Sequence, residues 1–344
     1  MASSFVPRAI FPYHESLPRS YFLGHHAAGL SKMKTMLSSI DLVIECRDYR
    51  IPLTSRNPLF EASLSGRQRL IVYTKRDLGS TGKEKDGQRE EIIRHWHAPT
   101  HVLFSDHRDK RDVRRILNFA KSHATHTNSL AGMRMLVVGM PNVGKSSLLN
   151  ALRMIGVGKG KAAYTGAQPG ITRKITTGVK IVEGTKDSEG VYLVDTPGVF
   201  IPYVPNAESM LKLALCGSVK DTIVPPTILA DYLLYHLNLQ SPDFYASYHP
   251  PTNEISDFLE AAARKMGRLR KGGIPDLGGT ALWIIQRWRD GQMGRFVLDE
   301  VMEGGLEMKK EEEEESFCGS INQARKMEKE KKRARVRARH LDGG

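Results

Sequence analysis

Short apolar runs recur along the first two thirds of the chain and predict buried strands. They cover residues 40–46, 70–73, 101–104, 135–138, 179–183 and 191–194. A short apolar run between polar segments is typical of a parallel strand, because helices cover both faces of a parallel sheet. Residues 110–125 and 147–152 carry apolar positions at helical spacing. This part of the chain is therefore expected to form an α/β domain with a mostly parallel sheet.

The pattern changes after residue 220. Residues 221–300 contain three stretches with helical spacing, separated by Pro and Gly clusters that end helices, and they predict a small all-α domain. This region also carries a basic edge with aromatic residues nearby in the sequence: Lys265, Arg268, Arg270, Lys271, Trp283 and Trp288. Such a combination suits RNA, through phosphate contacts and base stacking. The open alternative is that the tryptophans belong to the core, Trp283 above all.

One loop carries the strongest chemical signal. The segment Gly139–Ser146 (GMPNVGKS) follows an apolar run and precedes a helical run that starts at Ser147. It matches G-x4-G-K-[ST] in the strand–loop–helix context that a phosphate-binding loop requires. Its amides and the helix dipole can hold phosphate oxygens. Lys145 would contact the β- and γ-phosphates, and Ser146 would bind Mg2+.

The strand predicted at 70–73 ends in a candidate guanine-recognition segment, Thr74-Lys75-Arg76-Asp77, which is close to the pattern N/T-K-x-D. A carboxylate such as Asp77 can accept hydrogen bonds from guanine N1–H and the N2 amine, a pair of donors that adenine lacks. The stem of Lys75 would lie along the base plane. Ser105 and Asp106 follow the next predicted strand, where a backbone amide can contact guanine O6. An ordinary loop is the open alternative there.

The last predicted strand of this region ends in Asp195-Thr196-Pro197-Gly198, some 50 residues after Lys145. At that position Asp195 can support the Mg2+ shell, and the Gly198 amide can contact the γ-phosphate. Thr172, in the segment QPGIT, can complete the Mg2+ coordination while that phosphate is present. Loops that are ordered by the γ-phosphate are the means by which GTPases switch.

These four elements are typical of GTPases, but their order is unusual because the guanine-recognition segment precedes the phosphate loop. A circular permutation accounts for this order, since a site depends on placement in space rather than in the chain. The chain resembles the circularly permuted GTPases of the YlqF/RbgA type, most closely their mitochondrial ribosome-associated branch. The resemblance runs from about Tyr21 to about Phe296 and includes YFLGHH, IDLVIECRDYRIPLTSRNP and MGRLRKGG…GRF. The family's usual Asp-Ala-Arg is Asp48-Tyr49-Arg50 here, and its Trp-Phe-Pro-Gly-His is Tyr21-Phe22-Leu23-Gly24-His25.

Hydrolysis is expected to need help from elsewhere. Val199 stands directly after Gly198, where many GTPases carry a Gln that orients the attacking water. The resemblance implies His25 as the hydrolytic residue; packing or capping of the first helix is the alternative, and His26 is a local competitor. It also implies that Asn142 helps to bind K+ beside the phosphates. The catalytic candidates are thus His25, Lys145 and Thr172.

The expected nucleotide-binding residues come from all of these segments. They are Thr74, Lys75, Asp77, Ser105, Asp106, Asn142, Val143, Gly144, Lys145, Ser146, Ser147, Thr172, Asp195 and Gly198. The expected metal ligands are Ser146 and Thr172 for Mg2+ and Asn142 for K+. The expected organisation is an N-terminal extension (1–20), the permuted GTPase domain (21–220), a helical RNA-binding domain (221–300) and a charged tail (301–344).

Composition narrows the partners. A net charge of +13 favours an anionic partner such as nucleic acid or an anionic membrane surface. No stretch approaches the roughly 20 apolar residues that span a bilayer, so a soluble or peripheral protein is expected. Cys46, Cys216 and Cys318 lie far apart, which indicates a reducing compartment and no structural zinc.

The two ends of the chain have biased compositions. Residues 1–20 hold two arginines and one acid, which suits either a mitochondrial targeting segment or a disordered terminus. The tail carries EEEEE at 311–315 and then a basic run from Arg325 to Arg339. Opposite charge blocks with few aromatics predict disorder or a solvated helix.

The resemblance implies a GTPase that assembles the large mitochondrial ribosomal subunit, with hydrolysis of GTP to GDP and phosphate stimulated by that particle. The implied partners are GTP, GDP, and the rRNA and proteins of the large subunit. A monomer is expected, in peripheral contact with the matrix side of the inner mitochondrial membrane; a cytoplasmic location is the alternative. The alternative function is a GTP-dependent RNA-binding or membrane-tethered switch with incidental hydrolysis. A metabolic P-loop kinase would leave the segments TKRD and DTPG unexplained.

Overall fold

The computed structural model describes residues 5–13, 37–64, 66–127, 132–161, 178–184, 190–195 and 204–314. The chain divides into two compact units, Met1–Val301 and Met302–Gly344. Within the described part of the second unit, residues 305–314 form a helix. The sheet and the helices α2 (Pro58–Ser63) to α10 (Leu277–Arg289) belong to the first unit.

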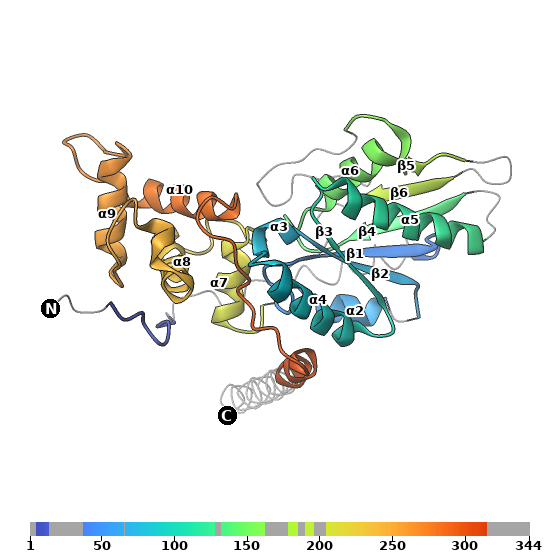
Figure 1. The fold of residues 1–344 in the computed structure, drawn as a ribbon, viewed down its shortest axis with the longest axis horizontal. Coiled ribbons are helices and arrows are strands. Elements are labelled where there is room, and N and C mark those ends of the chain that lie inside the picture. Colours follow the sequence, from blue (N-terminus) through green and yellow to red (C-terminus); the bar gives the residue numbers. More distant parts are fainter. Residues whose placement is uncertain are drawn as a thin grey trace, which may run out of the picture. The chain divides into compact units, whose positions relative to one another are not determined.

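Six strands form one sheet in the order β3-β2-β1-β4-β6-β5 (Figure 1). The strands are β1 (Leu42–Asp48), β2 (Arg69–Thr74), β3 (His101–Ser105), β4 (Met133–Val138), β5 (Val179–Val182) and β6 (Val191–Asp195). All neighbours pair in parallel except β5, which runs antiparallel to β6. Each apolar run identified in the sequence overlaps one of these strands, so the prediction of a mostly parallel sheet is confirmed.

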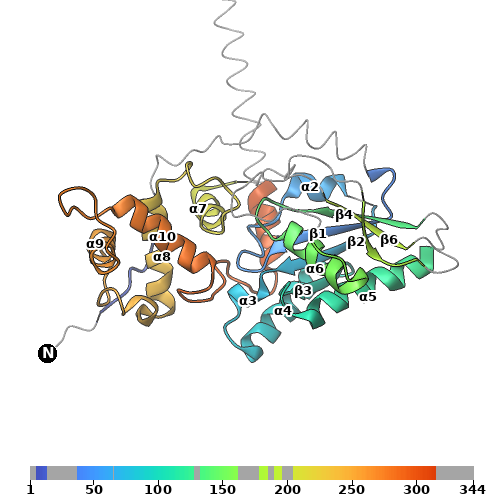
Figure 2. The ribbon, with the colours of Figure 1, turned by 90° about the horizontal axis from the view of Figure 1, so that it is seen from above.

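Alternate residues of the strands pack against helices on opposite faces of the sheet. Leu42 and Ile44 belong to a large hydrophobic cluster with α5 (Lys110–Thr127) and α6 (Lys145–Val157). Val43, between them, belongs to a second cluster with α2 (Pro58–Ser63). This alternation follows from the two-residue period of a strand. Figure 2 shows α2 on one side of the sheet and α5 and α6 on the other.

The parallel direction of five strands brings their carboxyl ends to one edge. β1 ends at Asp48, β2 at Thr74, β3 at Ser105 and β6 at Asp195, and β4 leads directly into the loop at Gly139. Ligands of open α/β sheets bind beyond the carboxyl ends of the strands. The candidate residues at these strand ends and in the loop at Gly139 therefore converge on the expected edge.

Two helices in the first half of the chain were not predicted from the pattern of apolar positions. They are α3 (Arg76–Gly79) and α4 (Lys83–His97), and α4 packs along β3. Most positions of α4 are charged or polar, and Ile93 and Trp96 are its buried apolar residues. Two buried apolar positions are too few to define a helical period, so sequence reasoning did not identify this helix.

The polar residues at the end of β1 and directly after it are buried rather than solvated. Arg47 and Arg50 are each 1% exposed. The guanidinium of Arg47 contacts Glu45 at 2.6 Å and Glu61 at 2.5 Å. Burial alone would lower the pKa of Arg47, but these carboxylates keep it above its ordinary value. Charged side chains can be buried here because they pair with one another.

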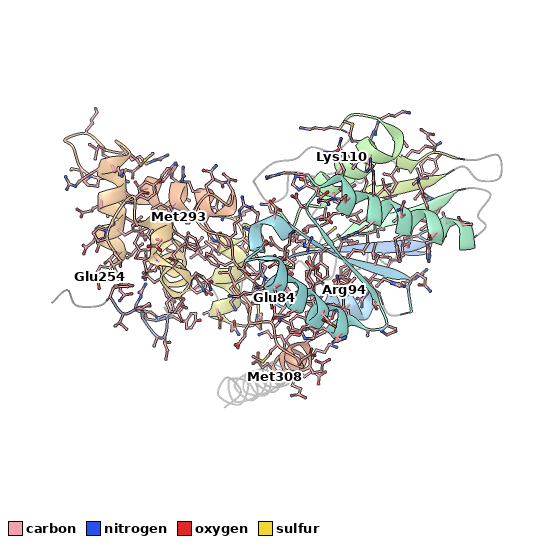
Figure 3. All side chains as sticks on the ribbon, viewed as in Figure 1. Glu84, Arg94, Lys110, Glu254, Met293 and Met308 are labelled. Carbon is pink, nitrogen blue, oxygen red and sulfur yellow. The ribbon has the colours of Figure 1, made fainter. Side chains whose placement is uncertain are left out.

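The helical part of the first unit comprises α7 (Ala207–Leu215), α8 (Pro226–Gln240), a 3-10 turn (Pro242–Tyr245), α9 (Ile255–Lys265) and α10 (Leu277–Arg289). The three helices predicted in residues 221–300 are α8, α9 and α10. They are joined by α7, which packs on α8. Met293, labelled in Figure 3, follows α10 and is buried in the same core. The boundary at residue 220 stays a prediction.

The two tryptophans of this region differ in exposure. Trp288 is 1% exposed and lies against the Arg50 guanidinium, with 4.9 Å from the guanidinium carbon to the ring centroid. Trp288 is thus a core residue, and the suggestion that it stacks on RNA bases is wrong. Trp283 is only partly buried against the core.

No helix in the described ranges is long and apolar enough to cross a bilayer.

Candidate functional site

The loop after β4 has the backbone of a phosphate-binding loop. Gly139 has φ +142°, and a Cβ there would lie 2.3 Å from the carbonyl oxygen of Cys46 on β1. Gly144 has φ +96° and immediately precedes α6. Only glycine adopts such conformations without strain and lets the backbone approach so closely. These two glycines explain why the motif requires glycine at both of its ends.

The first turn of α6 carries the polar residues of the loop. Lys145, Ser146 and Ser147 begin the helix, and the amides of a first helical turn have no partner within the helix. Such a helix start attracts anions. The Lys145 ammonium donates to the carbonyl oxygens of Gly139 at 2.9 Å and Met140 at 2.6 Å, so its charge lies over the loop. The residues predicted to hold phosphates are therefore close together.

Thr74 connects the guanine-recognition segment to the phosphate loop. Its hydroxyl oxygen lies within hydrogen-bonding distance of two carbonyl oxygens, that of Val143 in the loop and that of Arg47 in β1, the second at 3.0 Å. A Cβ on Gly144 would be 3.5 Å from the same hydroxyl oxygen. Thr74 also lies opposite Ser105 in the β2–β3 register. The threonine that replaces the commoner asparagine thus links three strand ends.

Lys75 is held in a fixed position by a buried carboxylate. It has φ +58°, and its ammonium is 2.9 Å from Asp48 Oδ2. Asp48 is fully buried and also binds the Arg50 guanidinium at 2.8 Å. Burial alone would raise the pKa of Asp48, but Arg50 and Lys75 outweigh it and hold that pKa far below its ordinary range. Arg50 and Lys75 together keep Asp48 ionised, and the ionised Asp48 holds Lys75 in place.

Asp77 and Asp106 are neighbours, although they follow different strands. Burial raises the pKa of Asp77, and the negative charge of Asp106 raises it further. Arg108 lies 3.9 Å from Asp77 and partly offsets this effect. Asp106 begins the turn into α5, and its amide donates to Asp112. Ser105, just before it, is 1% exposed. The two predicted guanine-contacting loops therefore meet beside the phosphate loop.

Comparison with known proteins agrees with this geometry. Residues 134–265 match a family model described as "50S ribosome-binding GTPase". The "Mitochondrial GTPase 1" of Schizosaccharomyces pombe is 36% identical over 87% of this chain and 94% of its own length. The "Mitochondrial ribosome-associated GTPase 1" of Xenopus tropicalis is 35% identical over 87% of this chain and its whole length. The chain belongs to the mitochondrial GTPase 1 family.

Solved structures support the same fold. YlqF from T. maritima in its GNP-bound form aligns with a TM-score of 0.54 over 79% of this chain and 98% of its own, at 22% identity. Its GDP-bound form aligns with a TM-score of 0.53. The chain is thus a GTPase with the circularly permuted fold that the order of its motifs predicts.

Asn142 of this GTPase faces the helical part of the unit. It has φ +57°, and its side-chain amide donates to the carbonyl oxygen of Gly217 at 2.8 Å. Gly217 follows α7, the first helix described after the DTPG segment. The predicted role of Asn142 as a K+ ligand stays a prediction. The contact with Gly217 could not be expected from the sequence, because 75 residues separate the two positions.

Several predicted residues lie outside the described residues of the GTPase. They are His25, Thr172 and Gly198, together with the competing candidate His26. Asp195 is described only as the last residue of β6. Their roles in Mg2+ binding and hydrolysis stay predictions.

Sequence reasoning missed the role of the Asp48-Tyr49-Arg50 segment. Its residues were noted for the resemblance and given no chemistry. In the structure Asp48 forms an ion pair with Lys75, and the Arg50 guanidinium contacts both Asp48 and the ring of Trp288 in α10. A signal existed: two charged residues flank an aromatic one directly after an apolar strand, at the edge where ligands bind.

Proposed function

We propose that this GTPase binds the large subunit of the mitochondrial ribosome in its GTP form and leaves after hydrolysis, as an assembly factor. The observation that carries the proposal is that a guanine-nucleotide site and a basic, partly aromatic surface occur in one compact unit. The names of the relatives and the description of the matching family model support the ribosome as the partner. They also support a mitochondrial location.

The surface that would contact rRNA lies between α9 and α10. Residues 268–276 form a short hairpin in which Leu269 bridges Pro275. Arg268 lies 5.3 Å from the centroid of the Trp283 ring, and Lys265 lies 5.8 Å from that of Tyr248. Arginine or lysine over an aromatic ring offers both a phosphate contact and a stacking face. We assign RNA binding to this surface.

Exposed apolar residues lie on the same hairpin. Leu269 is 47% and Ile274 61% exposed. The basic side chains around them suit the phosphates of either RNA or an anionic bilayer. Peripheral contact with the inner mitochondrial membrane on its matrix side, by a monomer, therefore remains part of the proposal.

Within the nucleotide site, each residue is given one task. Lys145 and the first amides of α6 would hold the β- and γ-phosphates, while Asp77 would accept hydrogen bonds from the guanine base. Mg2+, which GTPases generally use, would neutralise phosphate charge, and the hydroxyl of Ser146 at the start of α6 fits it as a ligand. Thr172 would be a second ligand, and Asn142 is proposed to hold K+. Equal hydrolysis rates in K+ and Na+ buffers would exclude the role of K+.

Hydrolysis is proposed to depend on His25. A histidine can orient water or accept its proton near neutral pH, a task that Val199 cannot perform. Large subunits should accelerate hydrolysis by wild-type protein, while small subunits should not. In His25→Ala the stimulated rate should fall by about 100-fold, the usual lower range for loss of a general base. The control His26→Ala should retain stimulation.

The alternative function is a GTP-dependent RNA-binding or membrane-tethered switch in mitochondrial translation, in which hydrolysis is incidental. The basic hairpin favours it as much as it favours an assembly factor. The two differ in the hydrolysis assay: a switch of this kind gives the same slow rate with and without large subunits. Stimulation that survives in His25→Ala would support the assembly factor and reject only the histidine.

A further inference from the structure

The turn that follows α7 accepts hydrogen bonds from three separate parts of the chain. A helix leaves its last carbonyl groups without partners inside the helix. In α7 these carbonyls, together with those of the following turn, belong to Ala214, Leu215, Cys216 and Gly217, and all four residues are buried. A buried carbonyl without a donor is costly. The donors that approach this turn therefore decide where it can sit.

The backbone of the turn is itself well defined. The Ser218 amide donates to the Leu213 carbonyl at 2.9 Å, and the Gly217 amide donates to the Ala214 carbonyl at 3.0 Å. Gly217 has φ +79°. This is the Schellman arrangement, in which a left-handed glycine ends the helix. The turn thus presents its outward-facing carbonyls as a rigid set rather than as a mobile loop.

The first donor comes from α10. The Arg289 guanidinium donates to the carbonyl oxygens of Leu215 at 2.9 Å and Ala214 at 2.8 Å. Asp221 holds the other side of the guanidinium at 2.7 Å. A cation at the carboxyl end of a helix is also favoured by the helix dipole. Arg289 therefore fixes the turn to the last helix of the helical part.

The other two donors come from the nucleotide site. Asn142 of the phosphate loop donates to the Gly217 carbonyl at 2.8 Å. Arg50 approaches the Cys216 carbonyl at 3.5 Å while its guanidinium also binds Asp48, the carboxylate that holds Lys75. One five-residue turn is thus in contact with the phosphate loop and, through two side chains, with the guanine-recognition segment.

We propose that the turn Ala214–Ser218 is a positioning element of the GTP site, and that Arg289 sets its position from α10. The turn holds Asn142 in the left-handed conformation that the phosphate loop needs, and it steadies Lys75 through Arg50 and Asp48. Nucleotide affinity then depends on the helical part of the unit. By linkage, a partner that displaces α10 changes nucleotide affinity, and nucleotide changes the affinity for that partner by the same factor.

The test measures binding of a fluorescent GDP derivative to the full-length protein. Arg289→Met keeps the aliphatic stem and removes the donors. If the turn loses a positioning effect equal to about one net hydrogen bond, GDP binding should weaken by about fivefold. The matched control is Arg287→Met on the same helix, whose guanidinium lies over the Trp283 ring at 5.0 Å; its affinity should be that of wild type.

A double-mutant cycle separates positioning from a general loss of stability. Asn142→Gly removes the amide donor but allows the left-handed backbone. If Arg289 acts through the turn on Asn142, the double variant should lose less affinity than the product of the two single losses. Restoration of affinity in Arg289→Lys, which can still donate to a carbonyl, would support the proposal further.

Two results would overturn the proposal. One is a folded Arg289→Met protein that binds GDP as wild type does. The other is a cycle in which the two losses multiply, because independent sites are additive in free energy. If Arg289→Met does not fold, Asp221→Asn loosens the same guanidinium from a half-exposed position. GDP binding should then weaken about twofold to threefold, and an unchanged affinity would reject the idea.

Discussion

The carboxylate of Asp77 provides the sharpest test of guanine recognition. It lies at the carboxyl edge of the sheet, beside Asp106 and next to the segment that Thr74 joins to the phosphate loop. Ionised, it can accept from guanine N1–H and from the N2 amine. A hydrogen bond to a charged group contributes about 1.5–3 kcal/mol. Replacing Asp77 by Asn removes the charge and presents an amide donor to the N2 amine, so both bonds are affected.

The expected loss in Asp77→Asn is about 3 kcal/mol or more, which corresponds to at least a ~100-fold weaker GDP affinity. Xanthine carries an oxygen where guanine has the N2 amine, so the new amide can donate to it. The variant should therefore bind XDP more tightly than GDP. Competition of GDP and XDP against a fluorescent nucleotide measures both affinities in one titration.

The pH dependence provides a second readout on the same residue. Because burial and Asp106 raise the pKa of Asp77, the free carboxylate takes up its proton at a higher pH than an ordinary aspartate. GDP affinity should begin to fall correspondingly early on acidification, and this part of the profile should disappear in Asp77→Asn. The control is Asp109→Asn, an aspartate in the β3–α5 loop that also holds Asp106 and that pairs with Arg111. GDP binding by Asp77→Asn within threefold of wild type would refute the assignment of the base-recognition residue.

Three further outcomes follow from the packing around the site. Thr74→Val removes the hydroxyl that lies within hydrogen-bonding distance of the Val143 and Arg47 carbonyls. It should lower the free energy of unfolding in urea by about 1–2 kcal/mol, whereas Thr125→Val, on the exposed side of α5, should leave it unchanged. Asp48 has a depressed pKa in the folded state, so its stabilising effect is present above the unfolded pKa of about 4 and is lost as the pH falls below it. Asp48→Asn should therefore lower the free energy of unfolding at pH 7 and flatten the acid limb of its pH dependence. An unchanged acid limb would contradict the ion pairs of Asp48. Leu149→Ala, in the fully buried face of α6, should lower the free energy of unfolding by about 2–5 kcal/mol, as measured by denaturant titration, and a cost below about 1 kcal/mol would contradict its place in the core.

The sheet was predictable because its signals are local. Runs such as 70–73 and 135–138 are apolar without interruption, and parallel strands have that signature when helices cover both faces. The phosphate loop was predictable for a different reason: the approach of Gly139 to Cys46 leaves no room for a side chain, so the sequence there has little freedom. In such segments the residues that form the structure are also the residues that carry the chemistry, so one sequence is enough to identify them.

The contacts between segments were not predictable in the same way. The pairing of Asp48 with Lys75, and of Asn142 with Gly217, depends on how distant strand and helix ends meet. Buried Arg47 and Arg50 look like residues of a solvated loop until their carboxylate partners are placed. Helix α4 was missed because a helix that buries only a few apolar residues has almost no hydrophobic period. Long-range pairing leaves no local pattern in the sequence.

We propose that GTP controls the association of this GTPase with the large mitochondrial ribosomal subunit. Sedimentation of the tagged protein from extract, with a non-hydrolysable GTP analogue or with GDP, tests it most directly when the co-sedimenting RNA is sequenced. We expect large-subunit mitochondrial rRNA to co-sediment with the protein in the presence of the analogue and to be lost with GDP. Equal recovery of that RNA with both nucleotides, or recovery of no ribosomal RNA with either, would contradict it.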